Sequence, residues 1–185
     1  MTWLAPRGVL VLGGIRSGKS EFAETLVSEA PRIRYLATAR RTGADGQPDP
    51  EWSARIDRHR ERRPDHWLTT EIGDDPLALA DLLGDADPDD ALLVDDIGTW
   101  VAAVTEIAPP VDLDRQSARL AAAVRACRSP LVLVSAEVGL SVVPATEAGR
   151  RFADALGTTN RAIADACDAL VLVIAGHAMW LKGEP

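Results

Sequence analysis

The feature that most constrains this chain is an octapeptide near its start, Gly-Gly-Ile-Arg-Ser-Gly-Lys-Ser at residues 13–20. It fits the G-x-x-x-x-G-K-[ST] pattern of a phosphate-binding loop, and an apolar run at residues 9–12 directly precedes it. Glycines in such a loop let successive backbone N–H groups turn toward phosphate oxygens, and the N-terminus of the following helix attracts the same anion. The pattern therefore predicts a nucleoside triphosphate site formed by Gly13, Gly14, Ile15, Arg16, Ser17, Gly18, Lys19 and Ser20.

Two side chains of this loop have expected roles in the chemistry. Lys19 would reach the outer phosphates, and the Ser20 hydroxyl would be a ligand for magnesium. Phe22, Leu26 and Val27 follow on one helical face, so a strand, a loop and a helix arrive in the order that the site needs. A glycine-rich turn that merely ends a strand is the alternative interpretation, and this order argues against it.

The composition suits a protein that works on small molecules. We expect residues 1–185 to form a single domain with one core, since 46% of the residues are hydrophobic and 26% are charged. The 20 basic and 28 acidic residues give a formal charge of −8, which argues against nucleic acid or an anionic membrane as the main partner. The two cysteines lack metal-ligand spacing, and no segment resembles a signal peptide or a membrane span. We therefore expect a cytoplasmic protein.

Short apolar runs alternate with amphipathic stretches along the chain, which is typical of an α/β fold. The apolar runs predict strands at residues 9–13, 34–38, 91–95, 131–136 and 169–175. The amphipathic stretches predict helices at residues 19–30, 51–63, 76–83, 113–127, 147–156 and 160–167. Together with the phosphate loop, this order predicts a P-loop NTPase of the RecA-like kind, with a mostly parallel central sheet flanked by helices.

A pair of carboxylates, Asp95 and Asp96, ends the strand expected at residues 91–95. In folds with a phosphate loop, an acid in this place positions magnesium or its water shell, so Asp95 is the candidate metal ligand beside Ser20. The competing interpretation is that the pair only turns or caps the chain after a strand. Asp96 is either a partner acid or a polar residue that faces solvent, and the sequence leaves both open.

A basic segment at residues 51–63 stands out in this acidic protein because it carries five arginines. On a helix, Trp52, Ile56, His59 and Arg63 fall on one stripe, so the imidazole would face inward with the apolar residues. A histidine in such a place is often a hydrogen-bonded packing residue, and an arginine-rich helix is often a solvated face. A neutral imidazole beside arginines is also what nucleophilic attack on phosphorus requires, which makes His59 the candidate catalytic nucleophile.

Taken together, these residues resemble the bifunctional adenosylcobinamide kinase / adenosylcobinamide-phosphate guanylyltransferase family of cobalamin biosynthesis. The phosphate loop alone is generic, whereas the ordered set with His59 in register is specific to this family. The likeness runs over nearly the whole chain. Besides residues 13–20 and His59, it is carried by Tyr35-Leu36-Ala37-Thr38, Arg55-Ile56, Arg63-Pro64, His66-Trp67, Thr70-Glu71, residues 92–95, Glu137-Val138-Gly139, Val143-Pro144, Arg151-Phe152, Asp154, Gly157, Asn160, Gly176 and Lys182.

The resemblance implies a two-step enzyme that forms a homotrimer. ATP or GTP first phosphorylates the aminopropanol arm of adenosylcobinamide. GTP then guanylylates a histidine, and the GMP passes to the phosphorylated corrinoid to give adenosyl-GDP-cobinamide. By position, His59 would carry the GMP. Beyond the phosphate loop, the implied contacts to the nucleotide are Thr38, Ala39, Arg40, Arg60, Glu61, Arg62, Arg63, Glu71 and Asp95.

Glu71 has a further expected role in selecting the base. A carboxylate accepts two hydrogen bonds from the N1–H and the 2-amino group of guanine, a pairing that adenine cannot supply. The alternative is an exposed acid at the end of a strand. Because the phosphate loop contacts phosphates and not the base, the choice between ATP and GTP in the first step stays open.

The chain departs from the family pattern at two positions. Ala136 stands where relatives often have Asn, which leaves the contacts to the corrinoid open, and Asp96 stands where they commonly have Cys. The imidazoles of His66 and His177 are expected to be structural or exposed. The cations of Lys182 and Arg151 are expected to contact either the acceptor or solvent.

Two other functions fit the phosphate loop alone. A small-molecule kinase in which His59 only packs would transfer phosphate without forming a covalent nucleotide. A non-catalytic nucleotide switch would bind a triphosphate and hydrolyse it slowly or not at all. The full-length resemblance disfavours both.

Overall fold

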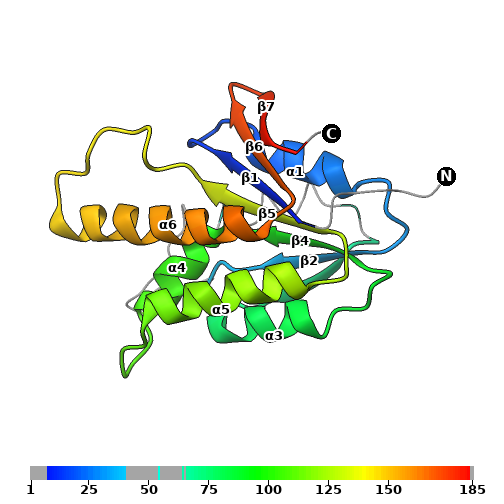
Figure 1. The fold of residues 1–185 in the computed structure, drawn as a ribbon, viewed down its shortest axis with the longest axis horizontal. Helices are drawn as coiled ribbons and strands as arrows, with labels where there is room; N and C mark the ends of the chain where they lie inside the picture. The colour runs from blue at the N-terminus through cyan, green and yellow to red at the C-terminus, as the bar shows by residue number, and fades with distance from the viewer. Residues whose placement is uncertain (1–7, 41–53, 55–63, 65, 184–185) are drawn as a thin grey trace.

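A seven-stranded sheet is the centre of the part of the chain that the computed structural model describes, residues 8–40, 54, 64 and 66–183 (Figure 1). Its strands lie in the order β3-β2-β4-β5-β1-β6-β7. β1 to β6 run parallel and β7 pairs antiparallel with β6, so the expected mostly parallel sheet is confirmed. The strands are β1 Val9–Gly13, β2 Ile33–Ala37, β3 Leu68–Glu71, β4 Ala91–Asp95, β5 Leu131–Ala136, β6 Ala169–Ile174 and β7 His177–Lys182.

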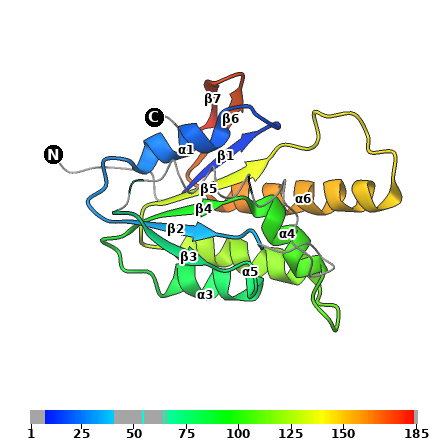
Figure 2. The same ribbon diagram turned by 180° about the vertical axis from the view of Figure 1, so that it is seen from behind.

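Helices cover both faces of this sheet (Figures 1 and 2). α1 lies on one face and α3, α4, α5 and α6 lie on the other, and each face has its own apolar core. The helix expected at residues 51–63 lies outside the described residues, apart from Ala54. The helices are α1 Lys19–Val27, the 3-10 helix η1 Pro76–Ala78, α3 Leu79–Gly84, α4 Ile97–Thr105, α5 Leu113–Ala126 and α6 Glu147–Ala166.

The central strands are buried on both faces, which explains why they read as unbroken apolar runs. All five residues of β1 are buried. Leu10 and Leu12 belong to the core that packs against α3 to α6, whereas Val9 and Val11 belong to the core that packs against α1. Because side chains alternate along a strand, one strand contributes to both cores.

α6 is one continuous helix, so the break expected between residues 156 and 160 is wrong. Gly157 is exposed and nothing lies within 4 Å of the place of its missing side chain, so it costs the helix only its low propensity. Thr159 is buried and donates to the Ala155 carbonyl at 2.9 Å. Packing of buried residues against the sheet therefore carries the helix through a stretch of weak helix formers.

Three of the elements are missing from those predicted by apolar runs and amphipathic stretches: β3, α4 and β7. In α4 six of the nine residues are buried, so no polar face marks it as an amphipathic helix. β3 and β7 are mostly exposed and lie at the two edges of the sheet, so neither has the unbroken apolar run of a central strand. Hydrophobic periodicity in the sequence therefore does not predict an element that is buried on all sides or a strand at the edge of the sheet.

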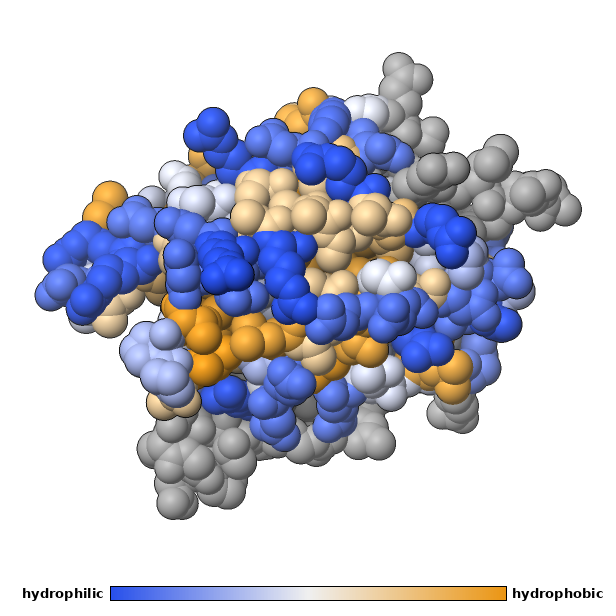
Figure 3. Space-filling view, turned by 60° about the horizontal axis from the view of Figure 1, so that its bottom comes forward, coloured by the Kyte–Doolittle hydropathy of each residue, from blue (hydrophilic) through white to orange (hydrophobic). Residues whose placement is uncertain are grey.

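The two cysteines are free thiols, and much of the surface seen in Figure 3 is hydrophilic. Cys127 and Cys167 are free and buried, and burial raises the pKa of Cys167 to about 12. In the ranges that the structure describes, no helix is long and apolar enough to cross a membrane. Figure 3, which brings the lower side of Figure 1 forward, shows hydrophilic residues across much of this face with apolar patches between them.

Lys182, at the end of β7, has a role that its sequence position does not suggest. Its ammonium group donates to the carbonyl oxygens of Ala164, at 3.0 Å, and Cys167, at 2.5 Å. These carbonyls lie at the C-terminal end of α6, where a cation offsets the partial negative charge of the helix. Lys182 therefore caps α6 while it remains exposed, and a contact with the acceptor stays a prediction.

Lys182→Met is expected to lower the free energy of unfolding by about 1 kcal/mol, because it removes a charge-assisted cap while keeping an aliphatic side chain. Urea unfolding followed by circular dichroism measures this loss. Lys182→Arg keeps a cation within reach of the same carbonyls and should lie close to the wild type. An equal loss in both variants would contradict the capping role.

Candidate nucleotide site

The phosphate loop joins β1 to α1 (Figure 1). It lies where the parallel strands have their carboxyl ends, which we call the carboxyl edge of the sheet. β1 ends at Gly13 and α1 begins at Lys19. The Ser17 N–H donates to the Gly14 carbonyl at 3.3 Å, which closes the loop on itself. The first backbone N–H groups of α1 have no partner within the helix, so this loop presents donors to an anion.

Glycine is required at three positions around this loop. A Cβ on Gly13 would lie 2.3 Å from Ser17 Oγ and 2.8 Å from the Val173 carbonyl oxygen. Gly18 adopts a left-handed φ of 91°, and a Cβ there would lie 3.2 Å from the Cα of Gly176. Gly176 is itself left-handed, with a φ of 81°. The loop therefore depends on missing side chains at Gly13 and Gly18 and on a left-handed backbone at Gly18 and Gly176.

Two neighbouring loops hold the phosphate loop from its sides. The Gly176 N–H, in the turn between β6 and β7, donates to the Ser17 carbonyl at 2.8 Å. The Glu137 N–H, at the start of the loop after β5, donates to the Gly13 carbonyl at 3.0 Å. The phosphate loop is thus preformed, which reduces the entropy lost when a ligand binds.

Unusual backbone conformations gather at the same edge. Among the described residues, the non-glycine positions with positive φ are Arg16 (57°), Asp96 (75°) and Ala175 (50°). Each one follows the carboxyl end of a different parallel strand, β1, β4 and β6. Such conformations cluster at functional sites, so they support a site at this edge independently of the sequence motif.

Lys19 and Asp96 link the phosphate loop to the end of β4. Lys19 is only 8% exposed, and its Nζ donates across the loop to the Gly14 carbonyl at 3.3 Å. Burial and the neighbouring Asp95 carboxylate raise the pKa of Asp96, and the Lys19 ammonium group partly offsets this effect. The cation of the loop therefore acts electrostatically on the acid that follows β4, which links the two segments at this edge.

Asp95, the last residue of β4, is held in place by Tyr35. The buried Tyr35 hydroxyl donates to Asp95 Oδ2. β5 alone separates β4 from β1 in the sheet, so Asp95 and Ser20 lie at the same edge. A carboxylate and a hydroxyl oxygen, completed by phosphate oxygens and water, are the donors that magnesium takes in nucleotide sites. The residues present therefore fit magnesium, with Ser20 and Asp95 as the expected ligands.

Asp96 is the N-cap of α4. Its Oδ1 accepts hydrogen bonds from the backbone N–H groups of Gly98, at 2.8 Å, and Thr99, at 3.4 Å. An aspartate in this position stabilises a helix because it satisfies donors that the helix cannot pair. The carboxylate is thus turned into the start of α4 and not into solvent, so the capping interpretation holds for Asp96, and a role as a partner acid in the metal site stays a prediction.

Thr38 connects the end of β2 to the same turn. Its buried hydroxyl lies 2.6 Å from the Asp95 carbonyl oxygen and 2.7 Å from that of Asp96, and it also contacts the Thr99 hydroxyl. The side chain therefore fixes the ends of β2 and β4 relative to each other. A contact of Thr38 with the nucleotide stays a prediction.

Ala39 and Arg40 lie against the turn after β3. Arg40 Nε donates to the Gly73 carbonyl at 2.8 Å, and the guanidinium lies 3.2 Å from Glu106. A Cβ on Gly73 would lie 2.6 Å from the Ala39 carbonyl oxygen, so only glycine permits this approach. Glu71, the end of β3, is exposed opposite Ala37. The expected contacts of Ala39, Arg40 and Glu71 with a nucleotide stay predictions.

Part of the expected site lies outside the described residues. The structure adds positions whose role the sequence did not reveal: Tyr35, Gly73 and Gly176. Tyr35 and Gly176 belong to the family motifs, but only the fold shows that they lie against Asp95 and Ser17. The undescribed candidates are His59, Arg60, Glu61, Arg62 and Arg63.

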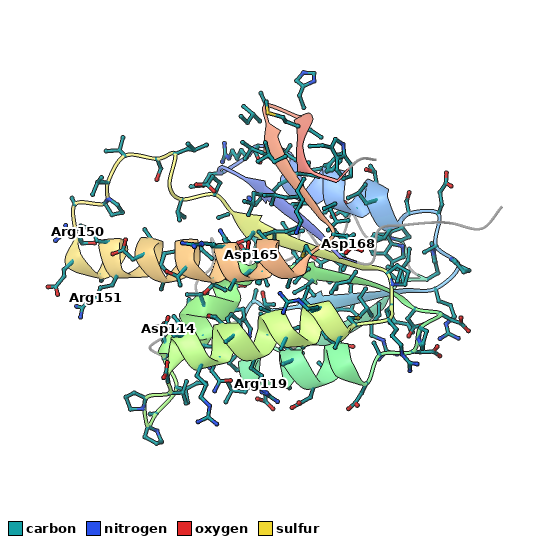
Figure 4. The ribbon with its side chains drawn as sticks, viewed as in Figure 1. Asp114, Arg119, Arg150, Arg151, Asp165 and Asp168 are labelled. Atoms are coloured by element: carbon teal, nitrogen blue, oxygen red, sulfur yellow. The ribbon has the colours of Figure 1, made fainter. Side chains whose placement is uncertain are left out.

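The remaining candidates are on the surface. His66 and His177 are both exposed, as expected. Arg151 lies with Arg150 near the N-terminal end of α6, which Figure 4 shows extending away from the sheet. It pairs with Glu147 at 3.3 Å, and both side chains are 74% exposed. Arg151 is thus at the surface, and a contact with the acceptor stays a prediction.

A parallel sheet with a phosphate loop after β1, a buried lysine in that loop and an acid at the end of β4 defines a P-loop NTPase fold. The chain matches the family described as cobinamide kinase / cobinamide phosphate guanyltransferase over residues 9–181. It belongs to this family, so the resemblance drawn from the sequence motifs is confirmed.

Relatives extend over nearly the whole chain. The bifunctional adenosylcobalamin biosynthesis protein CobP of Pseudomonas aeruginosa is 41% identical over 178 residues, which cover 95% of this chain and 98% of the relative. The bifunctional adenosylcobalamin biosynthesis protein CobU of Salmonella typhimurium is 36% identical and that of Escherichia coli is 33% identical. Each of these two alignments covers 94% of this chain and 99% of the relative.

Solved structures resemble the chain at the level of the fold alone. A Pyrococcus horikoshii protein has a TM-score of 0.51 at 7% identity, and the alignment covers 99% of this chain and 90% of the Pyrococcus chain. The RadB recombinase has a TM-score of 0.49 at 16% identity, covering 91% and 74% of the two chains. Neither likeness bears on the substrate.

Gly73→Ala is expected to destabilise the protein and weaken nucleotide binding, because the added methyl group would overlap the Ala39 backbone and displace Arg40. We expect a loss of about 1–3 kcal/mol in the free energy of unfolding, as for other overpacked positions. Chemical denaturation and titration with a fluorescent GTP analogue measure the two effects.

Gly84→Ala is the matched control for this variant. Nothing lies within 4 Å of the methyl group that it adds at the end of α3. It should leave both stability and nucleotide affinity near wild-type values. If Gly73→Ala behaved like Gly84→Ala, the close approach of the β3 turn to Ala39 would not be a requirement of the site.

Proposed function

We propose that the protein phosphorylates adenosylcobinamide with ATP or GTP and then transfers GMP from GTP to the product, giving adenosyl-GDP-cobinamide. One observation carries this proposal: a preformed phosphate loop with a buried lysine, Lys19, lies at the same edge of the sheet as Asp95 and Asp96 at the end of β4. The family and the relatives named as bifunctional support two activities in one chain. We take residues 1–185 as one domain that performs both.

In the kinase step, the loop amides and Lys19 would hold the outer phosphates of the triphosphate. The acceptor hydroxyl forms a bond to the γ-phosphorus, the bond to the β–γ bridging oxygen breaks, and the hydroxyl proton passes to solvent. This reaction needs mainly positioning and charge neutralisation. Ser20 and Asp95 would hold magnesium, which supplies positive charge to the phosphates when bound. Tyr35 keeps the Asp95 carboxylate in position for that role.

In the guanylyl step, we propose His59 as the nucleophile, and this assignment rests on the resemblance. A neutral imidazole nitrogen attacks the α-phosphorus of GTP, pyrophosphate leaves, and GMP remains on the histidine. A phosphate oxygen of adenosylcobinamide phosphate then attacks the same phosphorus and the imidazole leaves. Arginines offset the negative charge of the phosphates. In this segment, the residues proposed to contact the nucleotide are Arg60, Glu61, Arg62 and Arg63.

Glu71 is the proposed reader of the guanine base. Its exposed carboxylate ends β3, beside the end of β2 from which Thr38, Ala39 and Arg40 continue. A carboxylate accepts from both the N1–H and the 2-amino group of guanine and repels the acceptor nitrogen of adenine. This supports selection of GTP in the second step.

The protein is proposed to work as a cytoplasmic homotrimer that needs no membrane and no nucleic acid. The trimer rests on the resemblance to the family. Free, buried Cys127 and Cys167 suit a reducing compartment, where thiols stay unpaired.

The proposed function is tested by incubating pure protein with magnesium and α-labelled GTP, followed by denaturation and mass analysis. His59→Ala and His66→Ala are run in parallel, the second being an exposed imidazole outside the expected site. We expect a GMP adduct that is labile in acid and stable in alkali on the wild type and on His66→Ala. His59→Ala should bind GTP and carry no adduct.

The kinase step is followed separately with γ-labelled nucleotide and cobinamide. Phosphorylated cobinamide without any protein adduct would reduce the activity to that of a small-molecule kinase. GTP binding without either reaction would instead indicate a nucleotide switch.

A further inference from the structure

Exposed apolar side chains gather on the loop of residues 137–146, which joins β5 to α6. Leu140, Val142 and Val143 are 77%, 92% and 74% exposed, although aliphatic side chains of this size are usually buried. We call these three residues the apolar loop face. In Figures 1 and 2 the loop, drawn in yellow, leaves the sheet at the edge that carries the phosphate loop.

Hydrogen bonds within the loop give it a defined shape. The Ser141 hydroxyl donates to the Val138 carbonyl at 2.8 Å. The Arg150 guanidinium donates to the carbonyls of Pro144, at 3.0 Å, and Ala145, at 2.8 Å. The apolar loop face is therefore displayed by an ordered segment, which is a costly arrangement unless something covers it.

The position of the loop indicates what covers it. The loop begins at Glu137, whose N–H donates to the Gly13 carbonyl of the phosphate loop. Beyond the end of the loop, in α6, the partly exposed ring of Phe152 lies 3.7 Å from the place of a Cβ on Gly98, two residues after Asp96. A hydroxyl that receives the γ-phosphoryl group must reach the same edge, so its molecule lies alongside this loop.

We infer that the apolar loop face binds the apolar part of the phosphoryl acceptor and orients the reacting hydroxyl toward the γ-phosphate. This inference rests on the proposed function, because it takes the acceptor to be a large molecule with hydrocarbon surface. Leu140, Val142 and Val143 are then specificity-determining residues for the acceptor and make no contact with the nucleotide.

A second copy of the chain would be the other occupant, and the size of the face argues against it. The three residues expose on the order of 400 Å², whereas each partner of a standard protein interface contributes about 800 Å². A patch of this size, on a loop that begins beside the phosphate loop, suits a substrate better than a subunit contact.

The test compares two sets of substitutions. The first is Leu140→Ser/Val142→Ser/Val143→Ser on the loop. The second is Met179→Ser/Leu181→Ser, which removes aliphatic side chains that are 55% and 53% exposed on β7 and serves as the control. The readouts are the KM for cobinamide and the KM for nucleotide in the kinase reaction, the GMP adduct, and the molar mass by sedimentation equilibrium.

We expect the loop variant to raise the KM for cobinamide roughly tenfold or more, because several apolar contacts are lost. Its nucleotide KM, its adduct and its molar mass should match the wild type, and the β7 variant should match in every readout. Val142→Ser alone, at the most exposed position, should show the same split to a smaller extent, and it replaces the triple variant if that variant does not fold.

An unchanged KM for cobinamide in a folded loop variant of an active enzyme would overturn the inference and leave the proposed function intact. A raised KM together with a lower molar mass would also overturn it, in favour of a contact between copies. A wild type that neither phosphorylates cobinamide nor forms the adduct would refute the proposed function itself.

Discussion

Close packing of backbone segments at the carboxyl edge is the constraint on which the site depends. Gly13 and Gly18 lack side chains where the phosphate loop approaches β6 and the turn after it, and Gly176 supplies the left-handed backbone of that turn, so the segments come into direct contact. Any larger residue at Gly13 would have to push away both Ser17 and the backbone of β6. The place of Lys19 relative to the acids of β4 follows from this contact, because the loop carries Lys19 with it.

A second set of contacts fixes the ends of β2 and β4. Tyr35 holds the Asp95 carboxylate, Thr38 bridges to the backbone of the β4–α4 turn, and Asp96 caps α4. The edge also carries costs: two neighbouring carboxylates share a poorly solvated turn, and among the described residues the buried Ser17 hydroxyl has no hydrogen-bond partner. Concentrating charge and strain in one place is typical of sites where function is gained at the expense of stability.

The sequence predicts those parts of the fold whose signal is local. Strands such as β1 and β5 are buried on both faces, so their apolar runs are unbroken, and the phosphate loop is a contiguous motif. α4 has no polar face and β7 has no buried one, so periodicity reveals neither. The continuity of α6 through Gly157 depends on packing against the sheet, which no local pattern encodes.

The residues of the site also fall into those that a local motif predicts and those that only the fold brings together. Lys19, Ser20 and Asp95 follow from motif and strand order, whereas the partners that position them come from distant segments. Tyr35 and Asp95 are 60 residues apart in sequence, and their hydrogen bond follows from the pairing of β2 with β4. Likewise, the sequence shows Lys182 only as a cation near the end of the chain, and the fold shows that it donates to a carbonyl at the end of α6.

The central claim is that the phosphate loop and Asp95, at the end of β4, form one nucleotide site. A crystal structure of the protein with magnesium and a non-hydrolysable GTP analogue tests it most directly. The account predicts phosphate oxygens within hydrogen-bond distance of the loop amides and Lys19, and magnesium beside Ser20 with Asp95 as a ligand directly or through water. A triphosphate bound away from this edge, or a metal held by acids other than Asp95, would contradict it.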